Sequence, residues 1–267
     1  MKLIMKPICF ILIAFISLPV LIFSQDKTPF PARGGVGVQG GISIFAPKDL
    51  NDFTQDFWDN LTNKFYSYGY DGSDKAIPII FGVDYRIKAV GRFANAIQIE
   101  AWKENFYATG LEIKTDFYMY GYGYDQHLKA NYSFNPTYSA IGASLLFTPG
   151  AHKKRAFVTF GAGIGKYEGE LEYKRKGYEI VNGQTNTFDE TYHYKGDVTG
   201  YNATLGFTYV PWRIFEIETF FMGRWAKIPE ITDEDGNVFR NQYNNNEKVS
   251  LDFTGFDFRL GFKFILP

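Results

Sequence analysis

Apolar and polar residues alternate along eight segments of the chain. In the clearest segment, Tyr201, Leu205 and Phe207 fall on one face, and glycine, asparagine and threonine fall on the other. Successive side chains of a strand point to opposite sides, so this alternation predicts β-strands whose two faces have unlike surroundings. Strands are predicted over 36–44, 77–86, 93–103, 135–148, 156–167, 197–210, 213–225 and 249–264.

The connections between these segments alternate in length. Short links cover 87–92, 149–155 and 211–212, whereas long ones cover 46–76, 104–134, 168–196 and 226–248. In an up-and-down meander the short turns then gather at one end and the long loops at the other, as in bacterial outer-membrane barrels. The prediction is an all-β fold: an eight-stranded antiparallel up-and-down transmembrane β-barrel with long extracellular loops. Residues 111–120 also alternate, which leaves ten strands as an alternative.

The two strand faces differ in a way that indicates which side meets lipid. One face carries aromatic and branched residues, and the other carries glycines and charged residues. The interior of an eight-stranded barrel is barely wide enough for its own side chains, so rows of Phe, Tyr, Ile and Leu would overfill it. Small residues beside long charged ones suit a narrow polar lumen, and we expect the apolar face to lie outside. The alternative is a soluble periplasmic barrel of the lipocalin kind, with an apolar ligand inside.

The first residues predict export. Lys2 and Lys6 precede an apolar, uncharged run from 8 to 23, and the small residue Ser24 follows. This is the pattern of a signal peptide, predicted over 1–24, with one outer-membrane barrel domain over 25–267. The lone Cys9 falls within the signal, so no disulfide framework is expected. Aromatic residues make up 19% of the chain, and the net charge of −1 gives no indication of nucleic-acid binding.

The last predicted strand carries the most specific pattern. The residues predicted to point outward are Phe256, Phe258, Leu260, Phe262 and Phe264. They alternate with the charged residues Asp257, Arg259 and Lys263. This strand and the layout of the chain from Arg33 onward together resemble the small outer-membrane β-barrel family of the OmpA transmembrane-domain and OmpX type. The resemblance implies a location in the cell outer membrane, contact with outer-membrane lipid, and a terminal strand that the barrel-assembly machinery recognises. Such chains usually end on the aromatic residue, whereas this one continues through residues 265–267.

The inward face is predicted to hold a charge network. Both signs occur in similar number, and unpaired charges in a tight interior are costly, so we expect them to pair. A paired network would plug the lumen; the alternative is a narrow path for ions or small solutes. The predicted members are Asp84, Arg86, Glu100, Glu216, Glu218, Arg224, Asp257, Arg259 and Lys263.

Aromatic residues in the first two long loops form a candidate binding surface for a surface glycan or another envelope protein. They are Trp58, Tyr66, Tyr68, Tyr118, Tyr120, Tyr122 and Tyr124. The alternative is an interfacial girdle together with a hairpin that extends above the bilayer. Residues 51–64 predict a short amphipathic helix with Phe53, Phe57 and Leu61 on one face.

Few residues point to catalysis or to metal binding. Asp233, Asp235 and Asn237 offer oxygens, but their spacing does not match a calcium loop, and Asp-Gly is more simply a hairpin turn. His127 and His193 lie in outer loops, where a lipid-modifying enzyme would place its histidine, but no Ser-His-acid set accompanies them. We therefore expect no enzymatic activity, cofactor or metal. The predicted role is structural, surface contact or that of an accessory subunit.

Overall fold

The computed structural model describes residues 34–66, 80–93, 96–121, 124–149, 155–212 and 214–266. The predicted signal peptide, Tyr68 and Tyr122 lie outside the described residues, as do the side chains of Tyr66, Tyr120 and Tyr124. Among the described residues, no helix has the length and apolarity that a membrane span requires.

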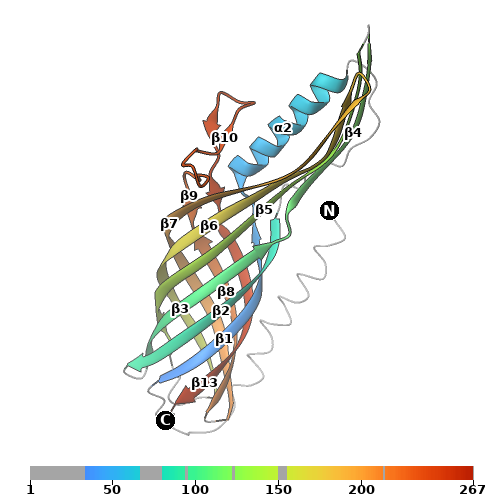
Figure 1. Cartoon of the computed structure of the whole chain (residues 1–267). Helices are drawn as coiled ribbons and strands as arrows, with labels where there is room; N and C mark the ends of the chain where they lie inside the picture. The colour runs from blue at the N-terminus through green and yellow to red at the C-terminus, as the bar shows by residue number, and fades with distance from the viewer. Residues whose placement is uncertain are drawn as a thin grey trace.

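Eight antiparallel strands close into a ring. Each strand pairs with the next along the chain, and the last strand pairs with the first from Gly34 opposite Leu266 to Phe45 opposite Gly255. The eight-stranded up-and-down barrel is therefore confirmed (Figure 1). Its strands are β1 (Gly34–Phe45), β2 (Ile80–Phe93), β3 (Ile97–Ala108), β5 (Tyr124–Phe147), β6 (Ala156–Val181), β7 (Gln184–Trp212), β8 (Phe215–Trp225) and β13 (Gly255–Leu266).

The ten-stranded alternative is wrong, although residues 111–120 do form a strand. Strand β4 (Leu111–Gly121) pairs with the first half of β5, from Leu111 opposite Phe134 onward. The second half of β5 pairs with β3 within the ring, from Tyr107 opposite Thr137. Apolar and polar residues therefore alternate along β4 because one of its faces packs on a core, but that core lies beyond the barrel.

Several predicted connections are strand instead. Residues 87–92 continue β2, residues 211–212 end β7, and most of 104–134 belongs to β3, β4 and β5. Residues 168–196 form the far parts of β6 and β7, joined at Asn182 and Gly183 with φ of 51° and 78°. These positive angles suit a tight hairpin turn. Together, β4 and residues 124–134, 168–181 and 184–196 form a four-stranded sheet that projects past the barrel, here called the extension (Figure 1).

The outer wall of the barrel is apolar and its interior is charged. On β13, Phe256 is 58% exposed whereas its neighbour Asp257 is 1% exposed, and the same alternation runs along the other strands of the ring. The prediction that the phenylalanines face outward is confirmed. A soluble protein buries apolar side chains, so the lipocalin-like alternative is wrong, and this wall belongs in a bilayer.

A second core lies on the concave face of the extension. The predicted helix is confirmed as α2 (Lys48–Tyr66), which follows β1 and lies along the extension (Figure 1). Phe53 packs against Phe134 and Phe239, and Phe57 packs against Tyr132. We call α2 and residues 226–254 the cap. The second part of the cap contains the short strands β9 (Lys227–Ile228), β10 (Arg240–Asn241), β11 (Glu247–Lys248) and β12 (Leu251–Asp252).

Candidate functional site

The structure places all nine predicted lumen charges inside the barrel, each at most 4% exposed. It adds Lys88, Arg92 and Glu104, which the sequence reasoning missed. Among the described residues, the interior network then has six cationic and six anionic side chains. The cations are Arg86, Lys88, Arg92, Arg224, Arg259 and Lys263, and the anions are Asp84, Glu100, Glu104, Glu216, Glu218 and Asp257.

Glu104 is the centre of the network near the extension. Its carboxylate lies 2.6 Å from Arg86, 2.8 Å from Arg259 and 3.6 Å from Arg224. The hydroxyl of Tyr138 donates a hydrogen bond to the same carboxylate and accepts one from Arg224. One acidic side chain on β3 therefore links residues from β2, β5, β8 and β13.

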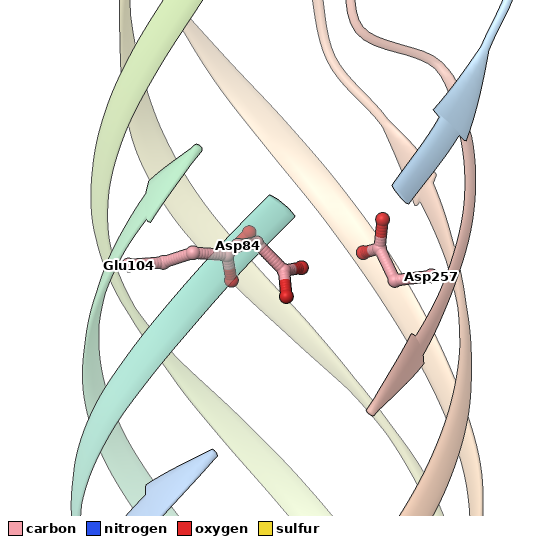
Figure 2. Close-up of side chains that lie close together, drawn as sticks. All are labelled: Asp84, Glu104 and Asp257. Atoms are coloured by element: carbon pink, nitrogen blue, oxygen red, sulfur yellow. The ribbon is translucent and has the colours of Figure 1, made fainter. Parts of the chain in front are cut away.

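Three carboxylates converge at this level, and Figure 2 shows their side chains directed toward one another. Asp84, Glu104 and Asp257 each offer an oxygen within 4.8 Å of the others. Arg259 lies 2.6 Å from Asp84 and 3.1 Å from Asp257, and Arg224 lies 3.0 Å from Asp257. With Arg86 on Glu104, three guanidinium groups supply the positive charge that a cation would supply to three acids.

A second group of charges occupies the interior toward the short turns. Lys88 lies 2.7 Å from Glu100 and 2.6 Å from Glu218. Lys263 contacts both Glu218 and Glu216, and Arg92 lies 2.8 Å from Glu216. Ion pairs therefore connect strands on several sides of the lumen.

Glycines on the inner face make room for these long side chains. A β-carbon at Gly41 would lie 2.6 Å from the Cγ atom of Arg259 and 2.7 Å from Asp84. A β-carbon at Gly142 would lie 2.5 Å from the indole of Trp102, which itself lies 4.2 Å below the Arg86 guanidinium. The inner face is packed to contact, as expected for a barrel of this size.

An aromatic layer covers the network at the end that carries the extension. Phe106 stacks on Tyr138 with ring centres 5.1 Å apart, and Phe253 of the cap packs on Tyr138 at 5.0 Å. Arg224 donates a 2.8 Å hydrogen bond to the carbonyl of Phe253. The cap is therefore attached to the charge network as well as to the extension.

The structure separates the predicted aromatic loop residues. Trp58 lies on α2 and packs toward Phe117 of β4 in the core between α2 and the extension, whereas Tyr118 lies on the opposite, exposed face of the extension. These two residues therefore do not share a surface. The phenylalanines of β13 lie on the outer wall, and their role as an assembly signal stays a prediction.

The exposed face of the extension carries a cluster that includes His127. Its ring stacks on Tyr118 at 3.9 Å and contacts the edge of Tyr178. His127 Nε2 lies 2.7 Å from Asp116, whose other oxygen lies 3.0 Å from Lys129. The hydrogen bond from His127, together with Lys129, lowers the pKa of Asp116.

The remaining predicted loop residues form local contacts. His193 lies 2.7 Å from Glu170, in a cluster separate from that of His127. Backbone amides of Asp235 and Asn237 donate to Asp233, and Gly236 has a φ of 83°, as the predicted Asp-Gly turn requires. Asp233 is thus engaged in its own turn.

No protein-family model matches the sequence, and no curated protein matches it significantly. Among solved structures, the chain is similar to the outer membrane protein OprG from Pseudomonas aeruginosa, with 14% identity, 88% of this chain and 97% of that chain covered, and a TM-score of 0.41. It is also similar to Ail, the attachment invasion locus protein of Yersinia pestis, in complex with the heparin analogue sucrose octasulfate (10% identity, 88% and 99% covered, TM-score 0.39). A third is Neisserial surface protein A (10% identity, 87% and 96% covered, TM-score 0.36).

The closed ring, the apolar wall and the charged interior together define the class of protein. A closed antiparallel barrel satisfies its backbone hydrogen bonds without an edge, which is what a bilayer demands of strands. Barrels with this inside-out distribution of polarity occupy outer membranes. The chain is a small integral β-barrel of the cell outer membrane.

Proposed function

We propose that the protein is a non-conducting outer-membrane barrel whose extension makes contacts at the cell surface. The observation that carries the proposal is the balanced charge network, which fills the interior with six cations and six anions under an aromatic layer. A molecule with such an interior has its functional surface outside the lumen.

The filled lumen argues against the alternative of a small channel. An ion crossing the barrel would have to displace pairs such as Arg86–Glu104 at 2.6 Å and Lys88–Glu218 at 2.6 Å. Breaking a buried pair leaves an uncompensated charge, which costs about 3–5 kcal/mol. The ion would also have to pass Phe106 and Phe253, which offer it no polar ligand.

The extension supports a surface-contact role. A barrel needs no four-stranded sheet beyond the bilayer to span it, yet this sheet has its own core formed with α2. On its exposed face, the His127 ring contacts both Tyr118 and Tyr178. Aromatic rings with polar edges suit sugar rings and protein side chains, so a surface glycan or another envelope protein is the proposed partner class.

Two measurements test the proposal. In planar bilayers, the purified protein is expected to show no conductance steps at high protein load. On a glycan array, protein in lipid nanodiscs is expected to bind a subset of glycans, and Tyr118→Ser is expected to reduce that binding by about tenfold, the loss of one good contact. Tyr192→Ser is the matched control, because Tyr192 is an exposed tyrosine that stacks on Tyr173 on the other face of the extension.

The outcomes are separable. Regular conductance steps from the wild-type protein would favour the channel alternative. An array without signal, combined with Tyr118-dependent capture of one purified envelope protein, would assign the surface to a protein partner. Equal losses in the Tyr118 and Tyr192 variants would show that the exposed face of the extension is not the contact surface.

A further inference from the structure

A groove of about 810 Å³ runs along the lipid-facing wall of the barrel. Its floor is a row of three small residues directly opposite one another on neighbouring strands: Ala89 on β2, Ala101 on β3 and Ala143 on β5. By contrast, the wall at β13 carries exposed phenylalanines at the corresponding outward positions. The groove is bordered by the larger side chains of Val36, Ile87, Ile141 and Ile164.

A lysine lies at the upper side of this groove. Lys103 points outward, opposite Ile87 on one side and Ile141 on the other. It is six residues from Ile97, where β3 begins at the short-turn end, or roughly 15 Å along the barrel axis for strands tilted by ~40°. The apolar band of such barrels is about 25 Å tall, so the Cα atom of Lys103 lies within it. Lysine at this depth extends its ammonium toward the head-group region or toward an anion.

The next outward positions above Lys103 form a polar cavity of about 520 Å³. Asn105, Ser139, Glu168 and Asp197 make up one cross-strand row, and all four line the cavity. Asn105 and Ser139 are half-buried although they belong to the outer wall, because the wall is hollowed here. The same strands therefore carry an apolar groove below and a hydrogen-bonding cavity above, with Lys103 between them.

We propose that this combined site holds one anionic lipid of the outer leaflet. Its acyl chain lies along the alanine row, its phosphate bonds Lys103, and the rest of its head group occupies the polar cavity. The charges support this assignment. Lys166, the other outward lysine of the groove lining, lies 3.4 Å from Glu168 and 3.5 Å from Asp197, whereas no ion pair joins Lys103 to any residue that the structure describes. The amine of Lys103 is thus left for an external anion.

Native mass spectrometry of the folded mature protein, released from detergent micelles, tests the site. The probes are phosphatidylglycerol and phosphatidylcholine with identical acyl chains. Their comparison therefore separates the effect of the head-group charge from the binding of the acyl chain. We expect one retained phosphatidylglycerol and a preference of about tenfold over phosphatidylcholine, the effect of one charge-assisted hydrogen bond. Lys103→Gln is expected to reduce the preference to less than about twofold while chain binding persists.

Groove-filling variants test the chain-binding half of the site. Ala101→Phe is expected to reduce retention of both lipids by at least about fivefold, because the ring occupies the groove. Ala203→Phe is the matched control, an outward alanine on β7 that lies outside the groove lining. Lys176→Gln on the extension is the control for charge. The gel shift on boiling verifies folding, and Ala143→Phe replaces Ala101→Phe if the latter fails to fold.

Several results would overturn the proposal. Equal retention of the two lipids by the wild-type protein would mean an unselective lipid coat. A preference that persists in Lys103→Gln would show that Lys103 does not bind the phosphate. Equal effects of Ala101→Phe and Ala203→Phe would show that the groove does not bind the acyl chain.

Discussion

Glu104 is the residue on which the interior depends most. It is fully buried and contacts the three guanidinium groups of Arg86, Arg224 and Arg259. Neutralising it leaves five buried carboxylates against six cations, and removal of one partner of a buried pair typically costs about 3–5 kcal/mol. We expect Glu104→Gln to lower the free energy of unfolding by that amount in urea titrations of the protein in lipid vesicles.

Two further variants give that experiment its contrast. Glu112→Gln removes an exposed carboxylate, paired with Lys114 on the extension, and is expected to change stability by less than about 0.5 kcal/mol. Glu104→Gln combined with Arg86→Gln restores the charge balance and is expected to recover part of the loss. If Glu104→Gln were as stable as Glu112→Gln, the interior network would not be a structural element.

Asp116 makes the extension sensitive to acid. The hydrogen bond from His127 holds the pKa of this carboxyl below its usual value of about 4. A lowered carboxyl pKa gives stability that is present above the ordinary pKa and is lost as pH falls through the lowered one. We expect hydrogen exchange of β4 to accelerate, relative to that of β13, as pH falls below about 4. Asp116→Asn is expected to remove this difference, and an unchanged acid response in that variant would assign it to other groups.

The sequence predicted that the charged residues point into the barrel, but it did not predict every member of the network. Alternation alone placed Asp84, Arg86 and Glu100 inside, because a two-residue period needs no knowledge of the fold. Lys88 and Glu104 continue the same phase, two residues after Arg86 and four after Glu100. They were missed because the strands were ended too early, at 86 and 103. Tyr138 could not be predicted as a network member, since its role depends on contacts with Glu104 and Arg224 from distant strands.

Among the secondary-structure elements, α2 connects the barrel to the extension. Phe53 is buried between Phe134 of the extension and Phe239 of the cap. Truncation of a buried phenylalanine to alanine costs about 3–5 kcal/mol, which exceeds what a helix of this length gains by itself in water. Phe53→Ala is therefore expected to release α2, measured as faster hydrogen exchange over 48–62 with unchanged exchange in β13. Asn60→Ala, on the exposed side of α2, is the control and is expected to leave exchange unchanged.

The hairpin of β6 and β7 depends on its turn. Gly183 has a φ of 78°, and a β-carbon there would meet no atom within 4 Å, so any cost of substitution comes from the backbone alone. For a residue with a side chain, that conformation costs roughly 1–2 kcal/mol. Gly183→Ala is expected to increase hydrogen exchange near the tip, over 176–190, without affecting β8. Identical exchange in wild type and variant would mean that the strands alone determine the turn.

The extension shows why the sequence located strands better than it located their ends. Residues 168–196 carry most of their charged residues on one side, but Arg175, Glu179 and Glu190 interrupt the apolar residues of the other side, so the apolar contrast that marks a lipid-facing strand is weaker there. Beyond the bilayer both faces meet water or a small core, and the alternation weakens without the strand ending. Residues 51–64 were predictable as a helix because Phe53 and Phe57 fall on one face. Their packing partners, supplied by segments distant along the chain, were not.

At the scale of the whole molecule, two barriers close the lumen in series: the charge network and the aromatic layer with the cap above it. Weakening one barrier leaves the other intact, so we expect no conductance from a variant that lacks residues 227–252, the part of the cap that covers the aromatic layer. We expect none either from Arg86→Ala with Glu104→Ala, which removes a paired cation and anion from the network together. Both changes in one chain are expected to give small conductance steps in planar bilayers. The gel shift on boiling verifies that each variant has folded. Current through either singly changed variant would mean that the remaining barrier does not seal the barrel. No conductance from the combined variant would mean that the remaining ion pairs around Lys88 and Lys263 suffice to block the barrel.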